Sequence, residues 1–359
     1  MAVNPWNVAV VGYGLSAKVF HIPFITAVPD LKLYGVVQRN PKPDNDAEKD
    51  HAGIKSWRSV EDMLKDDEVD VVVITSIPTT HFEMCKKSLE AGKNVVVEKP
   101  FVPTSREADE LIELAKTKGK LITVYQNRRW DSDFVTLQKI IKDGLLGDIA
   151  EFETHFDRHR PDAPPATWKV VDEPGNESIY DLGSHLIDQV YCLFGMPQRV
   201  TAFLGKQRRG VTQGPHDSFT VLLHYDGMLV TAKAGVISPH VRQLRYWVRG
   251  TKGSWYKYHL DVQEDQLRKG MRPTAQGFAI EPESHHAILT VAEGSEMKRS
   301  IHPTVSPLPT YLQFYKTLVD ALQGNSGVPV DAAQCRDVLR IIEMAQQSSA
   351  EGSTITTAA

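Results

Sequence analysis

The fold is decided by residues 7–17, Asn7-Val8-Ala9-Val10-Val11-Gly12-Tyr13-Gly14-Leu15-Ser16-Ala17. The first part is apolar and β-branched like a buried strand, and the second part is a Gly-x-Gly-x-x-Ala turn that leads into a helical stretch. In this context the first glycine makes a tight turn, the second lets the backbone approach a pyrophosphate, and the alanine allows close helix packing. The helix N-terminus adds N–H groups and a positive dipole end. The stretch predicts a dinucleotide site made by Gly12, Gly14, Leu15, Ser16 and Ala17.

Strand-like and helix-like segments alternate after this turn. We expect strands at residues 32–38, 69–75, 94–98 and 121–125, and helices at 15–28, 59–65, 80–91 and 105–117. Strands that alternate with helices of this length indicate a parallel sheet covered on both faces. Residues 1–126 are therefore predicted to form a doubly wound Rossmann domain.

The pattern changes after residue 126. Strands with alternating polarity are expected at 149–156, 200–204, 218–225, 229–236 and 245–249, with helices at 133–142, 311–323 and 332–348. Turn signals such as Asp226-Gly227 join several of these strands and indicate a largely antiparallel sheet. Residues 264–309 are rich in Gly, Pro and His and are expected to be loops. Residues 127–359 are predicted to form a second α/β domain.

Bulk composition narrows the function classes. A length of 359 residues suits two domains, and a net charge of -4 without a basic block gives no reason to expect nucleic acid. The three cysteines lack the paired spacing of a zinc or redox site, and His285-His286 has no nearby ligand pattern, so no metal is expected. No signal core or membrane-length apolar run is visible. We expect a cytoplasmic protein.

The end of the second predicted strand bears on cofactor choice. NAD sites usually place an acidic residue there, but this chain reads Val36-Val37-Gln38-Arg39-Asn40. Without a carboxylate to repel it, a 2′-phosphate would be accepted, and Arg39 would pair with that phosphate or stack on adenine. NADP is therefore favoured and NAD stays possible, with a merely solvated Arg39 as the alternative.

Two further segments carry groups suited to chemistry. Glu98-Lys99-Pro100 closes a predicted strand, and ligands of open α/β sheets bind beyond the carboxyl ends of strands. Asp181 and His185 are four residues apart, which puts both on one face of a helix. A histidine exchanges protons near neutral pH, and a carboxylate can orient it. From spacing alone, a helix-surface pair or part of a metal site remains an alternative.

The combination of the glycine turn, Glu98-Lys99-Pro100 and residues 181–188 resembles the Gfo/Idh/MocA family of glucose-fructose oxidoreductases, inositol dehydrogenases and rhizopine catabolism proteins. Residues 77–81, 91–95 and 125–131 are also similar to this family, the last to a subgroup that includes NADP-dependent scyllo-inositol dehydrogenases. The run Gly175-Asn176-Glu177-Ser178-Ile179 departs from the glycine-rich loop that is usual before Asp181.

The resemblance implies roles for particular residues. Lys99 would contact substrate and nicotinamide, His185 would be the general acid and base, and Asp181 would position the substrate hydroxyl and His185. Further cofactor contacts are expected from Gln38, Arg39, Ser76, Pro78, His81, Glu98, Asn127 and Arg128, and further substrate contacts from Tyr125 and Trp168. The resemblance also implies a large, mostly antiparallel second sheet whose open face serves a homodimer or homotetramer.

The expected reaction is reversible hydride transfer between a nicotinamide and a hydroxyl-bearing carbon of a sugar, inositol or polyol. Two alternatives stay open. One is reduction of an unrelated carbonyl or imine by the same groups. The other is a sensor that binds NAD(P) and regulates transcription through protein contacts, because fold does not fix function.

Overall fold

A computed structural model of the chain describes residues 4–163, 167–211 and 213–357. The chain divides into two compact units. The first unit comprises Met1–Asn127, Gln263–Phe278 and Tyr311–Arg336, and the second comprises Arg128–Val262, Ala279–Thr310 and Asp337–Ala359. Two segments from the second half of the sequence thus return to the first unit. Over the described ranges, no helix has both the length and the apolar character that crossing a membrane requires.

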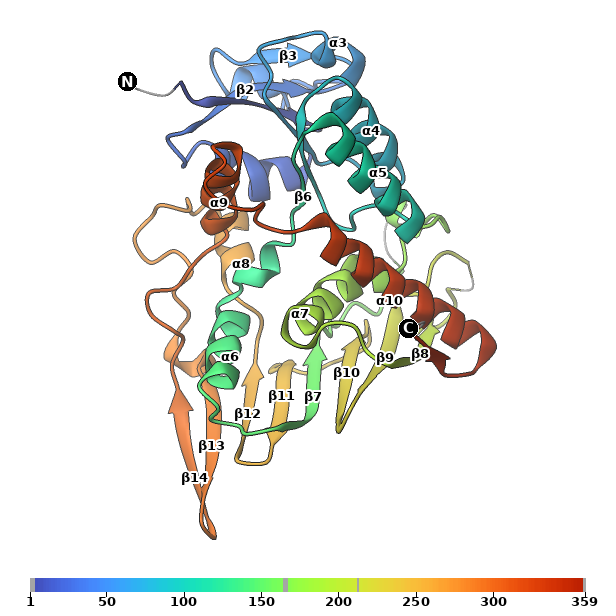
Figure 1. The fold of residues 1–359 in the computed structure, drawn as a ribbon, viewed down its shortest axis with the longest axis vertical. Helices are drawn as coiled ribbons and strands as arrows, with labels where there is room; N and C mark the ends of the chain where they lie inside the picture. The colour runs from blue at the N-terminus through green and yellow to red at the C-terminus, as the bar shows by residue number, and fades with distance from the viewer. Residues whose placement is uncertain (1–3, 164–166, 212, 358–359) are drawn as a thin grey trace. The chain divides into compact units, whose positions relative to one another are not determined.

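The first unit is built on a six-stranded sheet in the order β3-β2-β1-β4-β5-β6, with every pair parallel (Figure 1). The bounds are β1 Trp6–Val11, β2 Leu31–Val37, β3 Lys55–Trp57, β4 Val71–Ile74, β5 Asn94–Val97 and β6 Ile122–Val124. The predicted doubly wound parallel sheet is confirmed. The strand order reverses between β1 and β4, which is where ligands of such sheets bind.

Helices of the first unit are short near the site and longer on the sheet faces. Their bounds are η1 Ala17–His21, α1 Ile22–Ile25, α2 Ala47–Asp50, α3 Val60–Leu64, η2 Pro78–Thr80, α4 His81–Glu90, α5 Ser105–Lys118, α8 Gln263–Arg268 and α9 Leu312–Leu322. The helix expected at 15–28 is present at 15–25 and contains a π-helical turn followed by one α-helical turn. Between residues 38 and 59, where the sequence predicts no helix or strand, the structure has α2 and β3, which are too short to show a periodicity in sequence.

The second unit is built on a nine-stranded sheet in the order β14-β13-β12-β11-β7-β10-β9-β8-β15. The bounds are β7 Ile149–His155, β8 Arg199–Gly205, β9 Ser218–Tyr225, β10 Met228–Ala234, β11 Leu244–Gly250, β12 Gly253–Tyr258, β13 Ala287–Glu293, β14 Glu296–His302 and β15 Ile355–Thr356. The β7–β10 pair is parallel and the other pairs are antiparallel. The predicted large, mostly antiparallel sheet is confirmed.

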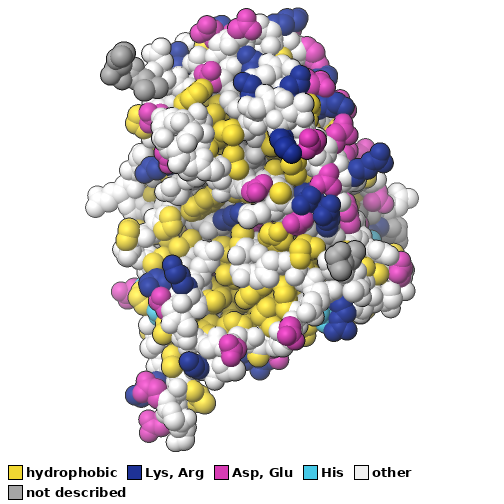
Figure 2. Space-filling model, in the orientation of Figure 1, with side chains coloured by type: hydrophobic (Ala, Val, Ile, Leu, Met, Phe, Trp, Pro, Cys, Tyr) yellow, Lys and Arg dark blue, Asp and Glu magenta, His cyan; other side chains and the backbone are white. Residues whose placement is uncertain are grey.

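The expectation of loops throughout 264–309 is wrong, because this segment contains α8, β13 and β14. All of β14 except His302 is exposed, so apolar and polar residues do not alternate between a buried and a solvent face. It forms by backbone pairing with β13, from Ala287 opposite His302 to Glu293 opposite Glu296. Figure 2 shows side chains of both charges at the end of this hairpin. Charges on an edge strand discourage pairing with other chains.

Helices cover one face of the nine-stranded sheet (Figure 1). They are α6 Ser132–Lys142, α7 Ser184–Phe194 and the second part of α10 Ala332–Glu351. Phe152, Val248 and Trp255 point to this face and are fully buried. The alternate residues point the other way, and Phe203 and Trp247 there are 69% and 42% exposed. The helix-covered face holds the core on which α7 is positioned.

Candidate functional site

The glycine turn after β1 has the shape that the sequence predicts. Gly12 has φ 101°, and its N–H donates to the carbonyl of Val37 at 3.0 Å. A Cβ on Gly12 would lie 2.8 Å from the hydroxyl oxygen of Thr75, whereas a Cβ on Gly14 would meet nothing within 4 Å. Open space beside the Gly14 backbone, at the start of a helix, fits the approach of a pyrophosphate.

The two residues at the end of β2 behave differently. Gln38 is buried, and its amide donates to the carbonyl of Asn45 at 2.7 Å and accepts from the N–H of Ala47 at 2.9 Å. Its side chain therefore holds the following loop. Arg39 is exposed and makes no hydrogen bond or ion pair with any described residue. Arg39 is thus the strand-end side chain that is available to a bound nucleotide.

Glu98 follows β5 and lies at the centre of a group of donors. One carboxylate oxygen accepts from the Ser16 hydroxyl and lies 2.9 Å from His21 Nε2, and the other accepts from the Lys99 N–H at 3.0 Å. Burial alone would raise the pKa of Glu98, but hydrogen bonds from His21 and Ser16 and the charges of His21 and Lys99 outweigh it and lower that pKa. Glu98 is therefore an ionised buried carboxylate beside Lys99.

The segment after β4 is held from inside by His81. Its Nδ1 lies 2.9 Å from the Pro100 carbonyl and its Nε2 lies 3.1 Å from the Ser76 carbonyl. His81 is fully buried, and burial lowers its pKa. Pro78 is also buried, and the Ser76 hydroxyl accepts from Thr80 at 2.8 Å. His81 and Pro78 therefore shape the loops after β4 and β5 from within.

The end of β6 offers buried polar atoms that no described residue satisfies. These are the Tyr125 hydroxyl and Gln126 Oε1. Burial raises the pKa of Tyr125 well above its ordinary value, so its hydroxyl keeps its proton. Buried polar groups are normally hydrogen-bonded, so atoms of this kind at the carboxyl edge of the sheet suit a polar ligand. Together with the glycine turn, they fit a nicotinamide dinucleotide.

In the second unit, Asp181 lies in a π-helical turn, η5 Ile179–Gly183, and His185 lies in the first turn of α7. His185 is 6% exposed. Lys169, from the turn η4 Trp168–Val170, lies 3.2 Å from an Asp181 carboxylate oxygen. Trp168 is 40% exposed, and its carbonyl accepts from the Asn176 side chain at 2.9 Å. The helical spacing expected for Asp181 and His185 is thus present.

The next turn of α7 is fixed by buried partners. Asp188 accepts two hydrogen bonds from Arg129, at 2.9 and 2.7 Å. Gln189 donates to the Arg128 carbonyl at 2.7 Å and accepts from Arg245 at 2.6 Å and from the Tyr246 hydroxyl at 2.8 Å. Since Gln189 is one turn beyond His185, these bonds also fix the direction of His185.

Asn127 and Arg128, predicted cofactor residues, are 6% and 5% exposed. Asn127 begins the turn η3 Asn127–Trp130. The guanidinium of Arg128 lies 3.3 Å from Asp131 and 5.0 Å from the ring centre of Phe156. Arg128 is therefore held against two residues of its own unit.

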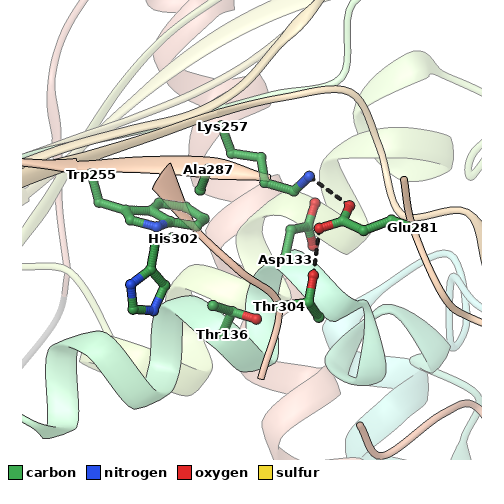
Figure 3. Close-up of a pocket in the computed structure, with 8 residues that line it drawn as sticks. All are labelled: Asp133, Thr136, Trp255, Lys257, Glu281, Ala287, His302 and Thr304. Atoms are coloured by element: carbon green, nitrogen blue, oxygen red, sulfur yellow. Dashed lines mark hydrogen bonds and ion pairs between the residues drawn. The ribbon is translucent and has the colours of Figure 1, made fainter. Parts of the chain in front are cut away.

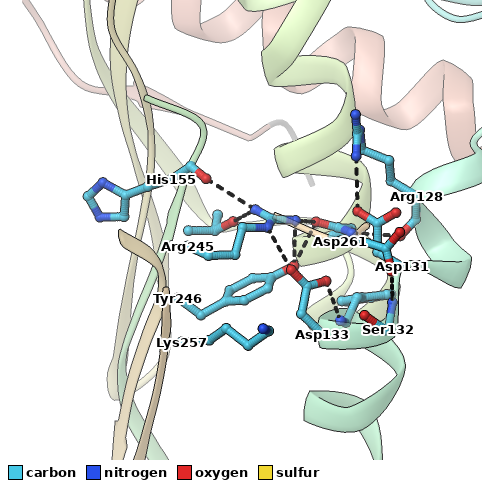
Figure 4. A network of polar contacts seen from close by, with 12 residues as sticks. Arg128, Asp131, Ser132, Asp133, His155, Arg245, Tyr246, Lys257 and Asp261 are labelled. Carbon is cyan, nitrogen blue, oxygen red and sulfur yellow. Dashed lines mark hydrogen bonds and ion pairs between the residues drawn. The ribbon is translucent and has the colours of Figure 1, made fainter. Parts of the chain in front are cut away.

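Arg245 is the centre of this buried network (Figure 4). It donates to Asp133 at 3.1 Å and to the Thr154 hydroxyl at 2.9 Å. Nearby, Asp261 accepts from the Ser132 N–H at 2.7 Å. Burial, together with the charges of Asp261 and Asp133, raises the pKa of Asp131 to about 8 despite the opposing charge of Arg128. The network thus holds a proton at neutral pH.

A second polar cluster lies where β12 and β13 meet α6 (Figure 3). The buried ammonium of Lys257 donates to Glu281 at 2.8 Å and to the His285 carbonyl at 2.5 Å. The Thr304 hydroxyl also donates to Glu281. The ring of His285 stacks on His259 at 4.0 Å. The described ranges contain no group of three or more residues that could hold a metal ion.

Several residues of these networks, among them His21, Tyr315, Gln189 and Arg245, have no place among the sequence-predicted site residues. Gln189 had a usable signal, because it is four residues beyond His185 on the same helix face. Tyr315 and Arg245 had none, since each meets its partner across a large separation in sequence, 294 residues for Tyr315 and His21.

Family models match both halves of the chain. Residues 6–126 match the model described as "Oxidoreductase family, NAD-binding Rossmann fold", and residues 138–357 match "Oxidoreductase family, C-terminal alpha/beta domain". An uncharacterized oxidoreductase of Schizosaccharomyces pombe is 39% identical over 98% of this chain and 99% of its own length. The scyllo-inositol 2-dehydrogenase (NADP(+)) IolW of Bacillus subtilis is 33% identical over 98% and 96%.

A solved structure agrees over the whole chain. The putative oxidoreductase YvaA of Bacillus subtilis superposes with a TM-score of 0.94 at 33% identity and covers 100% of both chains. The N-terminal match indicates that the Rossmann unit binds NAD(P). From the two family models and the full-length relatives, the chain belongs to the Gfo/Idh/MocA oxidoreductase family.

Proposed function

We propose that this oxidoreductase transfers hydride reversibly between the nicotinamide of NADP and a hydroxyl-bearing carbon of a sugar, inositol or related polyol. One observation carries the proposal: Asp181 in the π-helical turn η5 and His185 in the first turn of α7 are four residues apart on contiguous helical turns, and Gln189 anchors α7 through buried hydrogen bonds. A protein that only binds the cofactor has no need for an anchored acid and base. The relative named scyllo-inositol 2-dehydrogenase (NADP(+)) supports the substrate class.

Each residue has a separate task in this proposal. A bound nicotinamide dinucleotide supplies or accepts the hydride. His185 takes the hydroxyl proton during oxidation and returns it during reduction, because an imidazole exchanges protons near neutral pH. Asp181 orients the substrate hydroxyl by accepting a hydrogen bond from it. The ammonium of Lys99 favours the negative charge that develops on the reacting oxygen.

The substrate class is tested with a panel of inositols, hexoses and linear polyols, by following the absorbance of the reduced cofactor. We expect turnover of at least one panel member, and a loss of roughly 10²–10⁴-fold in kcat/KM for His185→Ala and for Lys99→Ala. His224→Ala, on β9 of the second unit, is the control. Turnover that survives in both active-site variants would refute the assigned roles. Tight cofactor binding without any turnover would favour the sensor, and turnover of non-sugar carbonyls or imines alone would favour the other reductase activity.

We assign the preference for NADP to Arg39, because it is exposed at the end of β2 and makes no hydrogen bond or ion pair with a described residue. We expect tighter binding of NADPH than of NADH in a fluorescence titration. Arg39→Glu should weaken NADPH binding by about tenfold or more, because a charge-assisted hydrogen bond is lost and a like charge is added. NADH binding should change by less than about threefold, as it lacks the phosphate. Equal loss for both cofactors would contradict the assignment.

We also propose a homodimer or homotetramer formed through the uncovered face of the nine-stranded sheet. The strand register puts Trp247, Tyr256, Ile288 and Ile301 side by side there. Glu151 of β7 lies opposite Arg249 of β11 on the same face, so a second copy can meet both charges. Light scattering of the wild type should give a multiple of the chain mass, and Trp247→Lys should lower the measured mass. A monomeric wild type would refute the proposal. The three cysteines are free thiols, which agrees with the cytoplasmic location we propose.

A further inference from the structure

Four side chains of the first unit are linked in a row by hydrogen bonds: Tyr315, His21, Glu98 and Ser16. The Tyr315 hydroxyl lies 2.6 Å from His21 Nδ1, and His21 Nε2 lies 2.9 Å from Glu98 Oε1. The Ser16 hydroxyl donates to the same Glu98 oxygen. His21 and Tyr315 have no part in the proposed reaction, yet both are completely buried. Their position needs a reason.

The ionised carboxylate of Glu98 determines which atoms around it donate. An ionised carboxylate only accepts, so Ser16 and His21 both donate to Glu98. The Nε2 atom of His21 therefore carries a proton, and Nδ1 lies within hydrogen-bond distance of the Tyr315 hydroxyl. With the N–H of Lys99 on the second carboxylate oxygen, at 3.0 Å, both oxygens of Glu98 accept hydrogen bonds. Three donors thus hold one largely buried negative charge.

The local fold brings these groups together. His21 ends the π-helical turn η1, in which the N–H of Ile22 bonds to the carbonyl of Ala17. The extra residue in a π turn shifts the side-chain direction relative to an α-helix, and such turns often occur at functional sites. The His21 ring lies 4.3 Å from the ring of Tyr125. His21 thus connects the helix after β1 with the ends of β5 and β6.

We propose that His21 is a positioning residue for the dinucleotide. Through Glu98 it fixes the Ser16 hydroxyl, which stands in the turn that takes the pyrophosphate, and the backbone of Lys99, which stands where the nicotinamide ends. One bond network thereby sets the spacing between the two ends of the cofactor site. The part of this inference that concerns Lys99 rests on the proposed function, and the part that concerns Ser16 rests on NAD(P) binding alone.

The alternative is a buried polar group that stabilises the fold and nothing more. Both possibilities predict a loss of thermal stability when the His21 side chain is truncated, because Glu98 then loses a donor in the interior. Only the positioning role predicts that cofactor affinity falls as well. The test therefore measures the dissociation constant of NADPH by fluorescence titration without substrate, and the melting temperature in parallel.

We expect His21→Ala to raise the dissociation constant about tenfold, which corresponds to one hydrogen bond to a charged group. His21→Gln should restore affinity to within about threefold, because its amide N–H can replace Nε2–H toward Glu98. Thr123→Val is the matched control in the same unit. It loses a buried hydrogen bond to the Val330 carbonyl at 2.8 Å, away from the glycine turn, and should lower the melting temperature without changing the affinity.

Affinity within about twofold of the wild type in His21→Ala, with a melting temperature lowered as in Thr123→Val, would overturn the proposal. If His21→Ala does not fold, His21→Gln and Glu98→Gln decide instead. The first should bind almost normally and the second about tenfold more weakly, and equal affinity of the two would also overturn it. Because the titration needs no substrate, failure of the polyol panel would leave this result intact, and the reverse is equally true.

Discussion

The two units build their buried polar networks in opposite ways. In the first, a single carboxylate, Glu98, is surrounded by hydrogen-bond donors from His21, Ser16 and the Lys99 backbone. In the second, the guanidiniums of Arg245 and Arg128 share their surroundings with the carboxylates of Asp131, Asp133 and Asp261. The first network converges on one carboxylate beside the glycine turn, whereas the paired charges of the second join α6 and α7 to the sheet through Arg245. One network therefore borders the glycine turn, and the other holds α7, which carries His185, in place.

Both units contain a π-helical turn next to their polar network. The helix after β1 and the helix that carries His185 both begin with a π turn, Ala17–His21 and Ile179–Gly183. In each case the turn contains a network or site residue, His21 in one and Asp181 in the other. A π turn changes side-chain direction where a regular helix would continue its own pattern. The difference between the units therefore lies in charge and not in backbone geometry.

The largest effect should come from removing the centre of the charged network. Arg245→Met leaves Asp133 buried without its guanidinium, and breaking a buried pair from one side costs about 3–5 kcal/mol of unfolding free energy. Urea unfolding followed by tryptophan fluorescence measures the loss. Lys139→Met, on α6 with Asp133, is the matched control because Lys139 and its partner Asp143 are 58% and 42% exposed. It should cost less than about 1 kcal/mol. Similar losses in the two variants would contradict the central role of Arg245.

The next effect concerns pH, to which the networks should respond in opposite directions. With a folded-state pKa of about 8, Asp131 keeps a proton that the unfolded chain loses above about pH 4. The unfolding free energy should therefore fall as pH rises from about 4 to 8, by at most about 1.4 kcal/mol per pH unit from this group. Asp131→Asn should flatten that fall, as measured by urea midpoints at a series of pH values.

Glu98 provides the opposite sign. Its pKa is lowered in the folded chain, so its contribution is present above the ordinary carboxyl pKa and is lost as pH falls through the folded value. Glu98→Gln should therefore weaken the loss of stability in acid and leave the slope between pH 6 and 8 as in the wild type. A flatter neutral slope in Glu98→Gln than in Asp131→Asn would reverse the comparison.

A smaller effect separates two glycines of the same turn. Gly12→Ala forces a side chain into a left-handed conformation, with its Cβ 2.8 Å from the Thr75 hydroxyl oxygen, and should cost about 1–2 kcal/mol of stability. Gly14→Ala meets no atom within 4 Å and should fold with wild-type stability. It should nevertheless weaken NADPH binding, because the methyl group occupies the space through which a pyrophosphate approaches. Unchanged affinity of Gly14→Ala in a fluorescence titration would argue against a dinucleotide at this turn.

Features formed by residues close in sequence could be predicted, whereas contacts between residues far apart in sequence could not. The Rossmann sheet could be predicted because strand, turn and helix lie within short stretches such as 7–17, and the helical placement of Asp181 and His185 could be predicted from their spacing, while their roles stay predictions. Strand β14 was missed because six of its seven residues are exposed, which leaves no periodicity. Arg245 could not be found, since its partners Asp133 and Gln189 are 112 and 56 residues away. Local patterns predicted the elements and their motifs, and burial across the fold decided which charges support them.

The smallest effect on stability is expected at an exposed ion pair that includes a residue of the proposed active site. Lys169 and Asp181 are 52% and 34% exposed and 3.2 Å apart, so water screens their attraction. Lys169→Gln should change the unfolding free energy by less than about 0.5 kcal/mol. The Asp181 carboxylate would still lose a cation that competes with the substrate hydroxyl for a carboxylate oxygen. It would also lose the partner that holds the carboxylate in place. These opposing losses should leave kcat/KM within roughly fivefold of the wild type, with KM changing more than kcat because binding is affected and proton transfer by His185 is not.

If kcat fell by orders of magnitude at unchanged stability, Lys169 would be part of the chemistry and the second unit would hold a catalytic cation of its own. That result would contradict the division of labour in which Lys99 supplies the positive charge and Asp181 with His185 supplies the acid and base. A change confined to KM would instead show that an exposed ion pair can tune substrate binding while the buried charges behind it keep α7 in place.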